Sequence, residues 1–375
     1  MAGLLADVDP DGLLEYSVVY TDRALNHMSR SFQGVMRDIS ATLCEVYRAE
    51  TVAVVPGSGT FAMEAVARQF ATDQRCLVIR NGWFSYRWTQ IFEAANMPAA
   101  ASVLKARQTT PGAQSPFQPV PIEEAEAAIA EQRPDVVFAP HVETSSGMML
   151  PDDYIRRLAD AVHSVGGMLV LDCIASGTVW LDMQACGVDV LISAPQKGWS
   201  GSPCCGLVMM NQTALERLAT TTSTSFACDL KKWHDIMQAY LDGGHAYHAT
   251  MPTDGLAAFC HVMRETQQRG FDVVKEQQLT LGKRVRSLLA SRGFASVAAA
   301  GFEAPGVVVS YTTDPAIQSG QKFLAQGLQI AAGVPLMCDE PEDFRTFRLG
   351  LFGLDKLQDI ERTVASLDAA LGEIS

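Results

Sequence analysis

A turn rich in glycine and hydroxyl residues, Gly57–Ala62 (GSGTFA), follows an apolar run and opens a helical pattern. Its backbone N–H groups and the hydroxyls of Ser58 and Thr60 would gather at a helix N-terminus, where the helix dipole favours a phosphate. The turn also fits the G-x-G-x-x-A pattern of dinucleotide binding. That pattern needs a carboxylate about 20 positions further on, yet the next strand ends in Arg80-Asn81. The turn therefore indicates phosphate binding, and its structural alternative is a plain strand–helix turn.

Two charged residues stand where other apolar strand patterns end. Asp172 closes the run MLVLD, and Lys197 follows the run VLIS within Ser193–Ser200. Either charge alone is most simply a solvated loop residue. A phosphate anchor, a carboxylate and a lysine together are what pyridoxal phosphate requires, because the lysine forms a Schiff base and the carboxylate keeps the pyridine nitrogen protonated.

The elements that would position these residues alternate between strand and helix. Strands that are apolar throughout and separated by helices predict an α/β fold with a mostly parallel sheet between helices, and ligands collect at the carboxyl ends of such strands. The predicted strands are Thr51–Val55, Cys76–Arg80, Asp135–Ala139, Met168–Asp172, Val190–Ser193 and Gly206–Met210, and the predicted helices between them are Thr60–Phe70, Phe84–Ala95 and Pro151–Val165.

The last third of the sequence predicts a second, smaller unit. Pro252–Arg292 is almost continuously helical in pattern, with a break at Gly270. Gly306–Thr312 and Thr346–Leu351 read as strands, and helices are expected from about Pro315 and from Lys356. We therefore expect an N-terminal segment (1–20), a large cofactor-binding domain (21–265) and a small C-terminal α+β domain (266–375).

Composition restricts the classes of partner. The 375 residues carry a formal net charge of −13, which disfavours binding to nucleic acid or to an anionic membrane. The N-terminus is acidic and does not resemble a signal peptide, and no run of about 18 apolar residues predicts a membrane span. Nine scattered cysteines without a C-x-x-C motif indicate reduced thiols and a cytoplasmic protein. The adjacent Cys204-Cys205 leaves a redox pair as the alternative.

Three segments in order, His141–Gly147 (HVETSSG), Leu171–Ser176 (LDCIAS) and Ser193–Gly198 (SAPQKG), resemble the class V aminotransferases of fold-type I. The likeness is greatest to the alanine–glyoxylate and serine–pyruvate group and extends from about residue 50 to the C-terminus. It implies that Lys197 is the Schiff-base lysine and that Asp172 pairs with the pyridine nitrogen. The residues implied to hold the phosphate are Ser58, Gly59, Thr60 and Gln196.

Further residues are assigned by the same resemblance. Asn81–Arg87 (NGWFSYR) is similar to the family turn N-G-x-aromatic-G-x-R, which implies that Phe84, or alternatively Trp83, stacks on the cofactor ring. Thr144 of the E-[ST]-S segment is implied to lie near the ring. Ile174 is implied to pack on the opposite ring face.

Two more motifs imply contacts beyond the ring. Tyr247–Pro252 resembles the Y-x-x-T-x-P stretch, so that Tyr247 and Thr250 would reach across a homodimer interface to the partner's phosphate. Arg348 resembles the arginine that grips the substrate carboxylate through two parallel hydrogen bonds. Two segments depart from the family pattern: Tyr20–Ser29 stands in place of a Gly-Pro-Gly-Pro-like loop, and Trp199–Gly206 replaces a shorter P-P-G.

The resemblance implies a ping-pong aminotransferase that moves an amino group from an alanine- or serine-like donor to a 2-oxo acid such as glyoxylate or pyruvate. A 2-aminoethylphosphonate–pyruvate transaminase is the first alternative. A lyase or desulfurase on the same fold is another, and Cys338 would be its loop cysteine. A nicotinamide-dependent oxidoreductase built on Gly57–Ala62 is the alternative from a different class.

Overall fold

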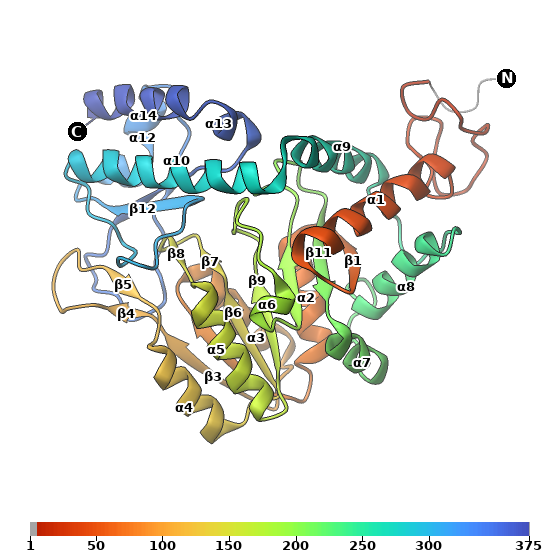
Figure 1. The fold of residues 1–375 in the computed structure, drawn as a ribbon, viewed down its shortest axis with the longest axis horizontal. Coiled ribbons are helices and arrows are strands. Elements are labelled where there is room, and N and C mark those ends of the chain that lie inside the picture. The colour runs from red at the N-terminus through yellow and green to blue at the C-terminus, as the bar shows by residue number, and fades with distance from the viewer. Residues whose placement is uncertain (1–5, 375) are drawn as a thin grey trace.

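The computed structural model describes residues 6–374 and shows an α/β protein built around one large sheet (Figure 1). Six of its seven strands run parallel to one another, and β11 alone runs antiparallel to both neighbours. The predicted α/β fold with a mostly parallel sheet is therefore confirmed. In spatial order the strands are β1 (Thr51–Pro56), β11 (Cys205–Met210), β10 (Val190–Ser193), β9 (Met168–Asp172), β6 (Val136–Pro140), β2 (Arg75–Arg80) and β3 (Ala100–Lys105).

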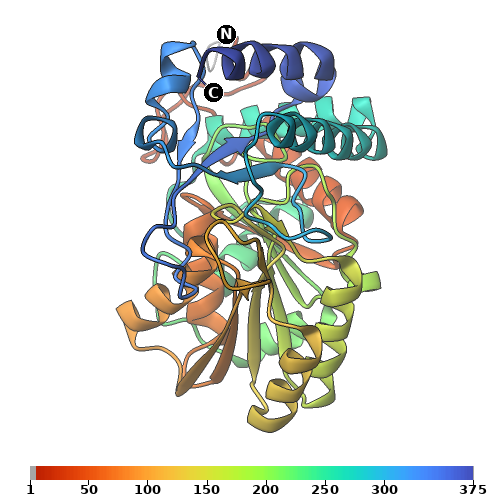
Figure 2. The same ribbon diagram turned by 90° about the vertical axis from the view of Figure 1, so that its left-hand side faces the viewer.

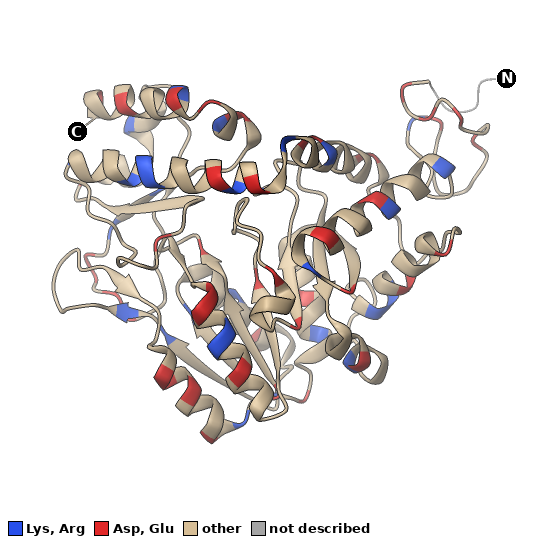
Figure 3. Cartoon of the chain, viewed as in Figure 1, with Lys and Arg blue, Asp and Glu red and all other residues tan. Residues whose placement is uncertain are grey.

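Helices cover both faces of this sheet. In Figure 1, α5 (Asp152–Ser164) lies in front of the sheet, whereas α2 (Gly59–Phe70) and α3 (Trp83–Ala95) lie behind it. Burial on two faces explains why β6, β10 and β11 contain no charged residue, while charged side chains gather on the outer helices (Figure 3). The other helices of this part are α1 (Arg30–Tyr47), α4 (Ile122–Gln132), α6 (Met183–Cys186), α7 (Gln212–Thr220) and α8 (Leu230–Leu241).

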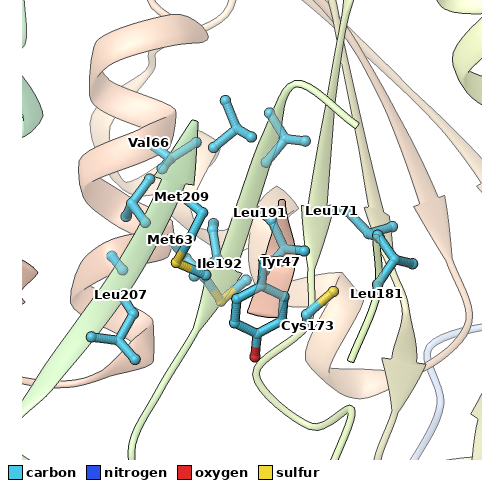
Figure 4. Close-up of a cluster of buried hydrophobic side chains, with 14 of the residues drawn as sticks. Tyr47, Met63, Val66, Leu171, Cys173, Leu181, Leu191, Ile192, Leu207 and Met209 are labelled. Carbon is cyan, nitrogen blue, oxygen red and sulfur yellow. The ribbon is translucent and has the colours of Figure 1, made fainter. Parts of the chain in front are cut away.

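The core between α2 and the sheet lies directly beneath the turn that begins α2. Met63 and Val66 of α2 lie beside Met209 of β11 in one buried cluster (Figure 4). Tyr47 from the end of α1 enters the same cluster, and its hydroxyl shares a 3.3 Å hydrogen bond with Ser193 Oγ at the end of β10. This packing fixes the N-terminus of α2 relative to the ends of the strands.

A smaller sheet and several helices form the upper layer in Figure 2. In this sheet β14 (Thr346–Gly350) lies between β12 (Val307–Tyr311) and β13 (Ala331–Ala332), and all pairs are antiparallel. The helices are α9 (Thr253–Arg269), α10 (Phe271–Ser291), α11 (Pro315–Gln318), α12 (Gln321–Ala325), α13 (Leu354–Gln358) and α14 (Ile360–Ile374), and two short hairpins pair β4 (Arg107–Gln108) with β5 (Phe117–Gln118) and β7 (Val142–Glu143) with β8 (Met148–Met149).

The C-terminal elements follow the sequence pattern with one correction. Gly270, at φ 90°, separates α9 from α10 as the pattern predicts. The single helix predicted from Lys356 is instead two helices, because Asp359 leaves the helical conformation and its Oδ1 accepts a 2.9 Å hydrogen bond from the Arg362 N–H. The predicted boundary at 265/266 falls within α9, and the division into domains remains a prediction. No helix within residues 6–374 is long and apolar enough to cross a membrane.

Candidate active site

A cavity of about 190 Å³ opens where the carboxyl ends of the parallel strands meet the N-terminus of α2. Nine of the residues singled out from the sequence line it, although they come from five separate segments: Ser58, Gly59, Thr60, Phe84, Thr144, Asp172, Ile174, Gln196 and Lys197. Four further residues complete the lining, namely Met63, Arg87, Val142 and Ala175. Phe84 reaches the cavity, whereas Trp83 packs against Tyr86 with 5.7 Å between ring centroids.

The turn at the start of α2, predicted to bind phosphate, has an open geometry. Ser58 precedes the helix in an extended conformation, and its hydroxyl makes no capping hydrogen bond. Gly59 lies so close to the opposite wall that a Cβ would come within 2.6 Å of Ile174 Cδ1. The N-terminus of α2 and the Ser58 hydroxyl, which caps no N–H group among residues 6–374, thus face the cavity, which suits an anion.

Asp172 is a buried carboxylate with few partners. Its Oδ1 accepts a 2.9 Å hydrogen bond from the Ile174 N–H, which is the only hydrogen bond of this side chain within residues 6–374. Burial raises the pKa of Asp172 to about 7, and the nearby Glu143 charge acts in the same direction. A cationic group in the cavity would stabilise the ionised form of Asp172.

Lys197 follows β10 on a turn that is anchored by aromatic packing. Burial lowers its pKa, and the charge of Arg348 adds to this effect, so that the Lys197 ammonium loses its proton more readily than an exposed lysine does. Its Nζ lies 5.2 Å from the centroid of the Phe352 ring, which comes from the upper layer. Trp199, two residues later, is fully buried against Trp180 with 4.6 Å between ring centroids. The departure from the family pattern at Trp199–Gly206 therefore begins with an anchor for the lysine turn.

Glu143 holds the aromatic wall of the cavity in place. It is fully buried, and its carboxylate accepts hydrogen bonds from the backbone N–H groups of Phe84, Ser85 and Ser145, at 3.2, 2.9 and 3.0 Å. The hydroxyls of Ser85 and Ser145 donate to it at 2.8 and 2.7 Å. Glu143 thereby caps the N-terminus of α3 and fixes Phe84 relative to Thr144.

Arg348 lies on β14 beside the cavity lining without forming part of it. Its Nε donates a 2.8 Å hydrogen bond to the Ala332 carbonyl oxygen, and its guanidinium carbon lies 5.6 Å from the Phe84 ring centroid. Burial lowers its pKa, opposed by the Glu143 charge. It forms no salt bridge with any carboxylate of residues 6–374.

Tyr247 and Thr250 lie outside the cavity of their own chain. The two hydroxyls share a 3.0 Å hydrogen bond, and Tyr247 is 54% exposed. The segment Tyr20–Ser29 also lies away from the cavity, since the His27 carbonyl oxygen accepts from the Tyr240 hydroxyl and His27 lies 5.6 Å from Tyr247, centroid to centroid. Arg23 within this segment is exposed and contributes nothing to the cavity lining of its own chain.

The donor groups around the cavity fit pyridoxal phosphate. The α2 turn offers an anion site, Asp172 a buried carboxylate with one hydrogen bond, and Lys197 an amine whose pKa is lowered by burial. Gln196 also has a buried Oε1 without a hydrogen-bond partner within residues 6–374. Arg87, Glu143 and Phe352 are not among the site residues predicted from the sequence, although each stands inside a segment that resembles a family motif, Phe352 in Phe347–Gly353.

Comparisons with known proteins agree with this geometry. Residues 14–341 match the family Aminotransferase class-V. A relative from Syntrophobacter fumaroxidans, named 2-aminoethylphosphonate–pyruvate transaminase, is 27% identical over 91% of this chain and 89% of its own. A relative of the same name from Burkholderia ambifaria is 28% identical over 94% and 92%. The solved structure of alanine–glyoxylate aminotransferase from Nostoc sp. gives a TM-score of 0.78 at 22% identity, covering 93% of this chain and 88% of that one.

The chain belongs to the class-V aminotransferase family. It is a pyridoxal-phosphate-dependent aminotransferase of fold-type I, as its motifs predict. The nicotinamide interpretation of Gly57–Ala62 is therefore wrong, because this turn belongs to a fold whose cofactor is pyridoxal phosphate.

Proposed function

We propose that the protein transfers an amino group from a small donor, alanine- or serine-like, to a 2-oxo acid such as pyruvate or glyoxylate in a ping-pong cycle. The observation that carries this proposal is Arg348, a partly buried guanidinium that has no carboxylate partner within residues 6–374 and that influences Lys197 electrostatically. A buried cation of this kind is stabilised by an anion, and the carboxylate of the amino or oxo acid supplies one.

Pyridoxal phosphate, when bound, supplies the aldehyde that captures the amine and the ring that accepts carbanion electrons. The residues of the chain then have separate tasks. Lys197 Nζ removes a proton from the donor carbon that carries the amine, and it returns a proton to the acceptor carbonyl carbon in the reverse half-reaction. Asp172 keeps a positive charge at the pyridine nitrogen, and Arg348 orients the carboxylate. Phe84 and Ile174, which both line the cavity, would enclose the ring.

The identity of the amino donor has a second candidate. The curated relatives from Syntrophobacter fumaroxidans and Burkholderia ambifaria both carry the name 2-aminoethylphosphonate–pyruvate transaminase, which favours this phosphonate as donor. With pyruvate as the acceptor, both candidates share the half-reaction that converts pyruvate to alanine, and in it Arg348 would bind the carboxylate. With 2-aminoethylphosphonate as the donor, Arg348 would meet the phosphonate in the other half-reaction.

A desulfurase is disfavoured by the position of its candidate cysteine. Cys338 is 4% exposed, and its Sγ donates a 3.4 Å hydrogen bond to the Arg80 carbonyl oxygen. Burial raises the pKa of Cys338 to about 12, so the thiolate nucleophile that a desulfurase needs is suppressed.

The proposal extends to assembly and compartment. We propose a homodimer in which Tyr247 and Thr250 contact the cofactor phosphate of the partner, which is supported by their exposed position and by their motif. A cytoplasmic location is supported by the nine cysteines, all of which are free thiols.

Two experiments test the substrate. Purified enzyme is mixed in single turnovers with alanine, serine or 2-aminoethylphosphonate, and the oxo products are identified. Arg348→Leu should slow the alanine–pyruvate half-reaction by roughly 30-fold or more, since losing a buried charged partner costs about 2–5 kcal/mol. Arg345→Leu is the matched control, because Arg345 precedes the same strand and its one side-chain hydrogen bond within residues 6–374 is to the Thr313 carbonyl oxygen. An unchanged half-reaction in Arg348→Leu would show that another group binds the carboxylate.

A further inference from the structure

Arg87 is a cation at the phosphate end of the cavity to which no role has been assigned. It lies one turn into α3 and lines the cavity together with Ser58, Gly59 and Thr60. Its Nη1 donates a 2.9 Å hydrogen bond to Thr60 Oγ1. That bond places the guanidinium directly beside the turn at the start of α2.

The guanidinium of Arg87 is underused. The bond to Thr60 is its only side-chain hydrogen bond within residues 6–374, although a guanidinium carries five N–H donors. No carboxylate of this part of the chain forms a salt bridge with it. Its charge acts on Asp172 across the cavity, where it opposes the rise in the Asp172 pKa, while its remaining N–H donors are available to a bound anion.

Two arginines, Arg87 and Arg348, lie near the same aromatic ring but contact different parts of the protein. The guanidinium carbons of Arg87 and Arg348 lie 5.2 and 5.6 Å from the Phe84 ring centroid. Arg87 bonds to the α2 turn, whereas Arg348 bonds to Ala332 of the small sheet. One cation is thus associated with the phosphate turn and the other with the upper layer beside Lys197.

We propose that Arg87 binds a tetrahedral phosphoryl oxyanion, and that this group is the cofactor phosphate. The planar fork of arginine matches two oxygens of such a group, while the α2 N–H groups and the Ser58 hydroxyl bind the others. A substrate phosphonate presents the same chemistry and is the second source of the anion. The inference rests on the use of pyridoxal phosphate at this site and not on the choice of donor.

The test compares pyridoxal phosphate with pyridoxal, which lacks the phosphate, in binding to the cofactor-free protein. Affinities are measured by equilibrium dialysis with absorbance detection for the wild type, Arg87→Met, Arg87→Lys and Arg348→Met. Arg87→Met should weaken binding of pyridoxal phosphate by about 10-fold or more and leave pyridoxal unchanged, because only the phosphate loses charged hydrogen bonds. The affinity of Arg87→Lys for pyridoxal phosphate should lie between those of the wild type and Arg87→Met. Arg348→Met, the control at the same ring, should leave the ratio of the two affinities unchanged.

Further measurements distinguish the cofactor phosphate from the substrate phosphonate as the bound anion. They also distinguish a lost phosphate contact from a structural defect. If the ratio is unchanged in Arg87→Met but the KM for 2-aminoethylphosphonate rises about 10-fold while that for alanine does not, the anion is the substrate phosphonate. An unchanged ratio with unchanged KM values overturns the proposal. An equal loss of both ligands overturns it too, since this marks a structural role, and circular dichroism with thermal melting identifies a misfolded variant. Half-reactions with alanine in the same preparations report on the proposed function separately.

Discussion

Two buried carboxylates near the cavity differ in how their charge is stabilised. Glu143 accepts five hydrogen bonds from the start of α3 and from the Ser145 loop, so its charge is fully used by the protein. Asp172 accepts one, from the Ile174 N–H, and lines the cavity. Glu143 therefore has a structural role. The ionised form of Asp172 is unfavourable in its buried position, and a cationic ring nitrogen beside it would stabilise that form.

This difference predicts how the stability of the cofactor-free protein depends on pH. The pKa of Asp172 is raised from 3.8 to about 7, so the folded protein favours the protonated carboxyl. The resulting contribution to the free energy of unfolding is fully present below pH 3.8 and is lost as pH rises through 7. Asp172→Asn removes this loss. Relative to the wild type, the variant should gain up to about 4 kcal/mol in free energy of unfolding between pH 4 and 8. Urea unfolding of both proteins across this range measures it, and parallel pH profiles would refute the assigned burial cost.

At the scale of elements, the lysine turn depends on contacts that join distant parts of the chain. Trp199 is buried among Trp180, Tyr47, Phe259 and Phe271, from four other segments. Ser200 adopts φ 59°, and its Oγ accepts a 2.9 Å hydrogen bond from the Leu354 N–H at the start of α13. These contacts hold Lys197 against Phe352.

The sequence predicts the strand ends at Asp172 and Lys197 because runs of apolar residues mark buried parallel strands, whose carboxyl ends share one edge of the sheet. It does not predict that Phe352 meets Lys197, or that Glu143 caps α3, because those contacts arise only when separate elements pack together. The helix α1 is not among the predicted elements either. Its buried face alternates with exposed polar residues at helical spacing, and that pattern was available in the sequence.

Truncation of the aromatic anchor tests the role of the lysine turn. Trp199→Ala should lower the free energy of unfolding by about 3–5 kcal/mol, because it leaves a large cavity in a fully packed cluster. The half-reaction rate should fall as well, since Lys197 loses its support. Trp83→Ala is the control, because this side chain is only partly buried and its removal should lower the free energy of unfolding much less. Equal costs in chemical denaturation would show that Trp199 does not anchor the turn.

At the scale of the whole molecule, the N-terminal segment extends beyond α1 at one side of the protein (Figure 1). It presents apolar side chains to solvent, with Tyr16 89% exposed and Leu13 85% exposed. Its His27 packs against Tyr247, which the sequence motif assigns to the partner's phosphate. An apolar segment next to these residues is what an interface between two copies requires.

Complementation between inactive variants tests the composite site. Lys197→Ala lacks the amine, and the double variant Tyr247→Phe, Thr250→Ala lacks the proposed phosphate contacts. After subunit exchange at limiting cofactor, a mixed dimer keeps one intact site, so random exchange should restore activity to about a quarter of the wild-type level. Sedimentation gives the oligomeric state. A fully active monomer, or no recovery after demonstrated exchange, would contradict a shared site.

Chemical trapping tests most directly whether Lys197 holds the cofactor. Borohydride reduction of the enzyme, followed by proteolysis and mass spectrometry, should place a phosphopyridoxyl group on the peptide that contains Lys197. Addition of an excess of the amino donor before reduction should abolish this label, because the donor amine displaces the lysine. A label on another lysine, or no label on an enzyme that transfers amino groups, would contradict the account.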